Sequence, residues 1–171
     1  LFALMHVLVH DAPRERLDLP FLVKRTASPY LVGPNGYYLR DRASRKPLVW
    51  DRARGAAVPF DTPGMDEALE GRYEADAIEI GPDDAVLAEG RLPGATAFTL
   101  TVDHLGPYTP EWAERVCEVP AARIRRIANE YLDHARVGET VEIDGVTLPY
   151  RPVAVSLGKT VNNGWGGYEC C

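Results

Sequence analysis

The residues best suited to bind a ligand are polar side chains and glycines near the end of the sequence. They are Lys159, Thr160, Asn162, Asn163 and Gly164. They follow residues 153–157, an apolar run whose composition predicts a strand covered on both faces. Amide side chains donate and accept hydrogen bonds, and glycine lets a backbone approach a bound molecule closely. A strand that runs into such a loop predicts a site for a polar heterocycle or a pyrophosphate. An ordinary Asn-Gly turn explains the same residues, and spacing alone slightly favours it.

Spacing excludes the usual nucleotide-binding motifs for this loop. A phosphate-binding P-loop needs a glycine five residues before Gly158, and Val153 stands there. The dinucleotide fingerprint GxGxxG is absent, because the glycines at 164, 166 and 167 miss its spacing. No Gly-x-Ser-x-Gly nucleophile motif occurs either.

Other polar clusters have simpler structural explanations. His6 and His10 are four residues apart, a spacing that can bind a metal on one helix face. Their apolar surroundings and the lack of a catalytic Glu favour core or rim histidines. Three arginines, Arg123, Arg125 and Arg126, are typical of a solvated helix face. The cysteines, Cys117, Cys170 and Cys171, form no CxxC pair, so a metal site made of cysteines is not expected.

Composition places the chain among ordinary globular proteins. Of its 171 residues, 46% are hydrophobic and 26% are charged, and the net charge is −6. No run of one charge sign supports binding to nucleic acid or to an anionic membrane. No apolar stretch approaches the roughly 20 residues that a membrane-spanning helix needs. The expected fold class is α/β, with mixed helices and strands.

The first half of the chain predicts a helix followed by short strands. Residues 1–10 are apolar and helix-like, and the sequence Asp11-Ala12-Pro13 stops them. A short helix is expected over 17–27, with Pro20 in its first turn. Residues 30–39 predict a hairpin around Asn35-Gly36, and 47–51 with 57–60 predict a second strand pair in a surface subdomain. Residues 61–94, rich in Gly, Pro and acids, predict a long irregular connection that contains two short strand-like pieces, 77–80 and 85–87.

The second half predicts a helix pair, a hairpin and the final strand. Residues 97–105 favour a helix over a strand on length and context. Thr109-Pro110 is a strong helix start, and the helix expected after Pro120 carries an apolar stripe, with Gly138 ending the segment. Residues 140–148 predict a hairpin that turns at Asp144-Gly145.

The helix-pair segment carries a resemblance to a known family. Residues 108–131 read YTPEWAERVCEVPAARIRRIANEY. This sequence resembles a segment of the molybdopterin oxidoreductases of the dimethyl-sulfoxide-reductase family. Residues 1–40 and 151–171 are also similar to stretches of that family, so the resemblance touches most of the chain outside 41–94.

The resemblance implies that residues 1–171 are an internal fragment of a large catalytic subunit. Residues 1–40 would end one α/β region, 41–94 would hold hairpins and the irregular connection, and 95–171 would hold the helix pair, hairpin, strand and Gly-rich loop. The family binds molybdenum or tungsten through two pterin guanine dinucleotides, usually with an iron–sulfur cluster, and transfers oxygen atoms or electron pairs. The implied partners are an electron-transfer subunit and the rest of the catalytic subunit itself. Family members occur in the periplasm or the cytoplasm of bacteria and archaea, so the compartment stays open.

By position, the resemblance implies that Lys159, Thr160, Asn162, Asn163 and Gly164 face the pterin. Many relatives have a His where this chain has Asn162. The cluster cysteines and the metal-ligating side chain have no counterpart here, so neither a catalytic residue nor a metal ligand is expected. The fragment alone is then expected to be inactive. The alternative is a non-catalytic binding or structural module with a Gly-rich loop.

Overall fold

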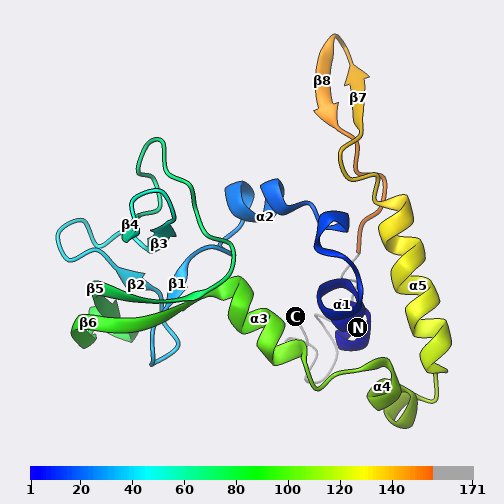
Figure 1. Ribbon diagram of the computed structural model, residues 1–171, viewed down its shortest axis with the longest axis horizontal. Coiled ribbons are helices and arrows are strands. Elements are labelled where there is room, and N and C mark those ends of the chain that lie inside the picture. Colours follow the sequence, from blue (N-terminus) through cyan, green and yellow to red (C-terminus); the bar gives the residue numbers. More distant parts are fainter. Residues whose placement is uncertain (156–171) are drawn as a thin grey trace.

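The computed structural model describes residues 1–155 of the chain. Six strands form the β region: β1 (Leu31–Val32), β2 (Leu39–Arg40), β3 (Leu48–Asp51), β4 (Ala56–Pro59), β5 (Arg72–Ile80) and β6 (Val86–Thr96). Figure 1 shows this region beside a group of helices, so the predicted mixture of α and β is confirmed. Four strands form an antiparallel sheet in the order β1-β6-β5-β2. β3 pairs with β4 in a separate two-stranded sheet, and this pair is the one that the sequence predicted.

The irregular connection predicted for residues 61–94 is wrong for most of its length, although the two strand-like pieces predicted at 77–80 and 85–87 fall on the observed strands β5 and β6. Residues 72–96 form the longest hairpin of the described chain, β5 paired with β6 around the short 3-10 turn η3 (Pro82–Asp84). Pro93 and two glycines lie inside β6, and these residues usually interrupt strands. The inner face of β5 carries the small residues Ala75 and Ala77, so the alternation between apolar and polar positions is weak.

The hairpin predicted for residues 30–39 forms only at its turn. Gly36 has a φ of +85°, which glycine adopts easily, and Gly36 N–H donates to the Gly33 carbonyl at 3.1 Å. Beyond one bridge between Val32 and Tyr38, the two strands separate. β1 pairs with β6 and β2 pairs with β5, because the long hairpin offers each of them a full partner.

The β region has its own apolar core. Its buried residues are Leu31, Leu39, Leu48, Ala75 and Ala77. Trp50 and Tyr73 pack against this core, and their rings stack with centroids 4.4 Å apart. The strand pair β3–β4 was predicted to be a surface subdomain, which is wrong for β3, because its Leu48 belongs to this core.

Asp51, a fully buried carboxylate, ties the end of β3 to the turn that follows it and to the loop after β4. It accepts hydrogen bonds from the backbone N–H groups of Ala53 at 2.9 Å and Asp66 at 3.2 Å, and from the side chain of Arg54. Burial raises the pKa of Asp51, but the hydrogen bonds from Arg54 and from the backbone outweigh burial and hold this pKa below its ordinary value.

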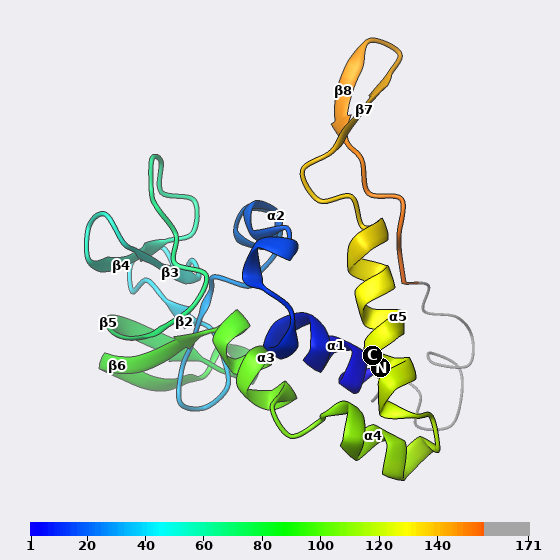
Figure 2. The same cartoon turned by 45° about the vertical axis from the view of Figure 1, so that its right-hand side comes forward.

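The helical region contains seven short or medium elements. They are α1 (Phe2–His6), the π-helical turn η1 (Val7–Asp11), the 3-10 turn η2 (Arg14–Arg16), α2 (Leu19–Arg25), α3 (Ala97–Leu105), α4 (Pro110–Cys117) and α5 (Ala121–His134). α1 and η1 are continuous, so the predicted helix over residues 1–10 is confirmed. Figures 1 and 2 show α1 lying among α3, α4 and α5.

Side-chain caps explain where the helices begin. Asp18, Thr96 and Thr109 each accept a hydrogen bond at 3.2 Å from a backbone N–H in the first turn of α2, α3 and α4. The predicted starts at Thr109-Pro110 and within residues 17–27 are confirmed, and residues 97–105 are helical as favoured. None of the helices within residues 1–155 is long and apolar enough to cross a membrane.

The apolar stripe of α5 is covered on part of its width. Ala121, Ile124, Ala128 and Leu132 are buried. Ile127, which continues the same three- and four-residue apolar spacing, is 41% exposed. One edge of the stripe therefore faces an open surface.

The hairpin predicted over residues 140–148 is confirmed. It consists of β7 (Thr140–Ile143) and β8 (Val146–Pro149). Asp144 and Gly145 have φ values of +51° and +77°, and two left-handed central residues match the twist of a two-residue hairpin turn. The hairpin projects away from the rest of the described chain in both views (Figures 1 and 2).

The buried strand predicted over residues 153–157 is wrong for its described part. Residues 151–155 form no strand, and Val155 is 60% exposed. A strand needs a neighbour to pair its N–H and C=O groups, and no strand within residues 1–155 lies beside this segment.

Candidate functional site

The five residues predicted to face a ligand lie outside the described residues. Lys159, Thr160, Asn162, Asn163 and Gly164 all follow Val155 in the sequence. The structure therefore shows the surface from which this segment departs. That surface lies between α1, η1 and α5.

Val155 borders a small apolar groove of about 120 Å³. Leu4, Met5 and Leu8 line one side of it, and Ile127 and Tyr131 of α5 line the other. The exposed edge of the α5 stripe is one wall of this groove. Val155, the last described residue, thus lies at an apolar surface that two helices shape.

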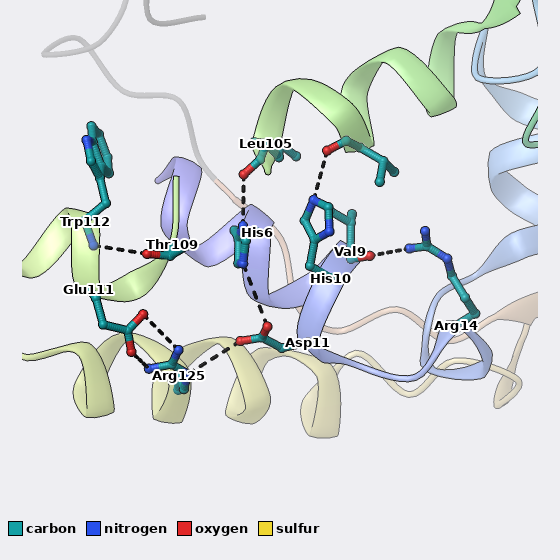
Figure 3. Close-up of polar contacts among 11 residues, drawn as sticks. His6, Val9, His10, Asp11, Arg14, Leu105, Thr109, Glu111, Trp112 and Arg125 are labelled. Atoms are coloured by element: carbon teal, nitrogen blue, oxygen red, sulfur yellow. Dashed lines mark hydrogen bonds and ion pairs between the residues drawn. The ribbon is translucent and has the colours of Figure 1, made fainter. Parts of the chain in front are cut away.

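A network of polar side chains holds these helices together, as Figure 3 shows. His6 Nδ1 lies 2.9 Å from the carbonyl oxygen of Leu105, and His10 Nε2 lies 2.9 Å from that of Val102. Both carbonyls belong to α3. A carbonyl oxygen can only accept, so each of these ring nitrogens carries the proton and donates.

The two histidines act as structural residues. His6 is buried, with 8% of its surface exposed, and its ring stacks on that of His10 with centroids 4.6 Å apart. The interpretation of the pair as core and rim residues is confirmed. Within residues 1–155, no three His, Cys, Asp or Glu side chains gather in a way that could hold a metal ion.

Arg125 joins α5 to α4 and to η1. It donates to the Glu111 carboxylate twice, Nη1 to Oε1 at 2.6 Å and Nη2 to Oε2 at 3.1 Å (Figure 3). Its Nε lies 3.5 Å from Oδ2 of Asp11. The sequence predicted a solvated face for the arginines of this helix. Arg125 is partly exposed, but it has two specific carboxylate partners that spacing did not reveal.

The pKa of Glu111 reflects this pairing. The hydrogen bond from Arg125, helped by the backbone at the start of α4, lowers the pKa of Glu111 from 4.5 to about 2. Because this folded-state pKa is lower than the unfolded one, the pair stabilises the fold above pH 4.5. That contribution is lost as the pH falls from 4.5 toward 2.

Replacing Arg125 with Gln is expected to raise the pKa of Glu111 toward its ordinary value of 4.5. The reason is that the bidentate partner of the carboxylate is removed. A pH titration of the Glu111 side-chain carboxyl by NMR measures the change. Arg123→Gln, an exposed change on the same helix, should leave the Glu111 pKa near 2. Equal titration curves for wild type and Arg125→Gln would contradict the pairing.

The described part of the site offers positioning rather than reaction chemistry. Its polar groups are engaged in joining α1, η1, α3, α4 and α5. The one cysteine within residues 1–155, Cys117, is exposed on α4. The arrangement fixes α4 and α5 relative to each other and to η1.

Comparison with known proteins adds one relative. No family model matches the chain. A sulfite dehydrogenase subunit from Allochromatium vinosum is 33% identical to it over an alignment of 127 residues, which covers 66% of this chain and 12% of that protein. This relative is, by its name, a dehydrogenase and one subunit of its enzyme. The chain is therefore related to a component of an oxidoreductase.

Proposed function

We propose that the chain is part of a molybdenum or tungsten oxidoreductase that binds two pterin guanine dinucleotides and transfers oxygen atoms or electron pairs. In this proposal the chain contributes scaffold and one part of the pterin pocket. Lys159, Thr160, Asn162, Asn163 and Gly164 face the pterin. An iron–sulfur cluster and the metal-ligating side chain come from other parts of the subunit, and an electron-transfer subunit is its partner.

The observation behind the oxidoreductase class in this proposal is the similarity to a dehydrogenase subunit, whose name gives no cofactor. The helix pair supports it as well, because α4 and α5 carry the sequence that resembles the molybdopterin family. Arg125 and Glu111 hold those two helices together.

The donor groups of the loop fit the proposed ligand. Asn162 and Asn163 can each donate to and accept from the edge of a pterin ring. Lys159 supplies one positive charge for a phosphate group, and Gly164 permits a close backbone approach. The bound metal centre supplies the redox chemistry, while these residues bind and orient the cofactor.

Replacing Asn163 with Ala in the full-length subunit is expected to lower its pterin and metal content and its turnover together. The amide would be lost from the edge of the pterin, and a lost hydrogen bond in such a site costs about 1 kcal/mol or more. Metal analysis, pterin fluorescence after extraction, and turnover are measured on the same preparation. If all three stay at wild-type values, Asn163 does not contact the cofactor.

Thr147→Ala, in the exposed hairpin, is the matched control and should change none of the three quantities. Metal analysis of the wild-type full-length protein tests the wider proposal. A full-length protein that contains neither molybdenum nor tungsten would favour the alternative, a non-catalytic binding or structural module with a Gly-rich loop.

A further inference from the structure

The β7–β8 hairpin carries one wholly apolar face. In its register Val141 lies opposite Leu148, and Ile143 lies opposite Val146. Cross-strand partners share a face of a sheet, and so do residues two apart on one strand. These four aliphatic side chains therefore form a single surface, here called the hairpin face. Glu142 and Thr147 lie on the opposite face.

Most of the hairpin face is open to solvent in the described chain, and Val141 is half-buried. Ile143 is 53% exposed, Val146 55% and Leu148 41%. β7 and β8 form a two-stranded sheet that pairs with no other strand within residues 1–155. An isolated two-stranded hairpin is marginally stable in water unless its apolar face is covered. Its regular register and four adjacent aliphatic residues therefore indicate a surface that is covered in the working protein.

Arg151 fixes the base of the hairpin. Its Nε and Nη2 donate to Oδ2 of Asp18 at 2.8 and 2.6 Å, and its Nη1 donates to the carbonyls of Arg136 at 3.1 Å and Glu139 at 3.2 Å. The N–H of Tyr150 also donates to the Glu139 carbonyl at 2.9 Å. The hairpin face is thus held in one orientation relative to α2 and the end of α5.

The chemistry and size of the hairpin face limit what can cover it. The face has no charged residue, which fits an aliphatic surface. Four side chains bury far less than the roughly 800 Å² per partner of a stable protein–protein interface. When a separate molecule binds, the contact must offset the translational and rotational entropy that the molecule loses. A contact as small as the hairpin face is too weak to do so. A surface in the same polypeptide avoids most of that cost, because tethering raises its effective concentration.

We propose that the hairpin face packs against an aliphatic patch in another part of the same, longer polypeptide. The alignment spans only 12% of the related dehydrogenase subunit, so a protein of that size has ample chain to provide the patch. This inference rests on the part of the proposed function that makes the chain a segment of a larger subunit. It does not depend on the cofactor.

Photo-crosslinking in the full-length subunit tests the inference. A p-benzoylphenylalanine at Val146 is irradiated, and crosslinked peptides are identified by mass spectrometry. The expected product joins Val146 to a peptide of the same polypeptide outside residues 1–171, at monomer size on a denaturing gel. The same probe at Thr147, on the opposite face, should give little of this product.

Three outcomes overturn the inference: a dimer-sized product, a crosslink to a different polypeptide, or no crosslink from Val146. A paired substitution supplies a second measurement. Ile143→Thr with Val146→Thr should speed proteolysis within residues 140–149 by about tenfold, since apolar contact is lost. Glu142→Gln with Thr147→Ala should leave that rate unchanged.

Failure of this inference can be distinguished from failure of the proposed function. Metal and pterin contents of the wild-type subunit report on the cofactor alone. If the crosslink forms in a protein that lacks both, the packing holds and the cofactor assignment fails. If both are present without the crosslink, only the packing fails.

Discussion

Replacing Glu79 with Ala is expected to lower the free energy of unfolding of the chain by about 3 kcal/mol, because three donors lose a buried acceptor. Glu79 is fully buried near the end of β5. Its carboxylate accepts from the N–H of Asn35 at 3.0 Å, from the Asn35 side-chain amide at 2.9 Å and from the N–H of Tyr37 at 3.1 Å. These bonds hold the turn between β1 and β2 against the long hairpin. Urea unfolding followed by circular dichroism measures the effect.

Two variants make the Glu79 result specific. Glu79→Gln keeps the chain length and one acceptor oxygen, so it should cost clearly less than Glu79→Ala. Glu89→Ala removes an exposed carboxylate of the same hairpin, whose nearest cation, on Arg42, lies 3.3 Å away. An exposed pair of this kind contributes at most about 1 kcal/mol. If Glu79→Ala costs no more than Glu89→Ala, the buried carboxylate does not hold the turn.

Replacing Leu105 with Ala is expected to cost about 3 kcal/mol of stability, since it leaves a cavity in the helical region. Leu105 ends α3 and is 1% exposed. Its carbonyl also accepts from His6, so α1 is attached at the same residue. Thermal unfolding monitored by near-ultraviolet circular dichroism measures the loss, because Trp112 of α4 reports on this region.

Val116→Ala is the control for Leu105→Ala. Val116 lies on α4 and is 64% exposed, so its truncation should change stability by less than about 0.5 kcal/mol. Equal costs for the two variants would mean that Leu105 is not part of a packed interior.

Local signals in the sequence identified the helices and the exposed hairpin. Thr109 and Pro110 start α4 through contacts within its first turn, and Asp144-Gly145 forms the hairpin turn through its own two residues. The structure at both places therefore does not depend on distant contacts. Local signals marked only two short pieces of the long β5–β6 hairpin, 77–80 and 85–87, and gave neither its length nor its pairing. Its strands contain Gly90 and Pro93, and their pairing is decided by the core they cover rather than by their own composition.

The prediction of the candidate site rests on the sequence alone, because its five residues lie outside the described residues. The loop residues 159–164 came from their types and from the family resemblance, and the structure describes only the surface that leads to them. The Arg125 network was missed because Glu111 lies 14 residues away and Asp11 lies on another helix. Helical spacing relates residues three and four apart, so it cannot reveal a contact between helices.

The π-helical turn at Val7–Asp11 has a consequence for how the chain tolerates changes in length. The N–H of Ala12 bonds to the carbonyl of Val7 at 2.9 Å, so the turn holds one residue more than an α-helical turn. Loss of one residue here could be absorbed by an ordinary α-helical bond. Loss of one residue from β5 would move every later side chain of that strand to the other face. Homologous chains should therefore vary in length near residue 9 far more readily than between residues 72 and 80.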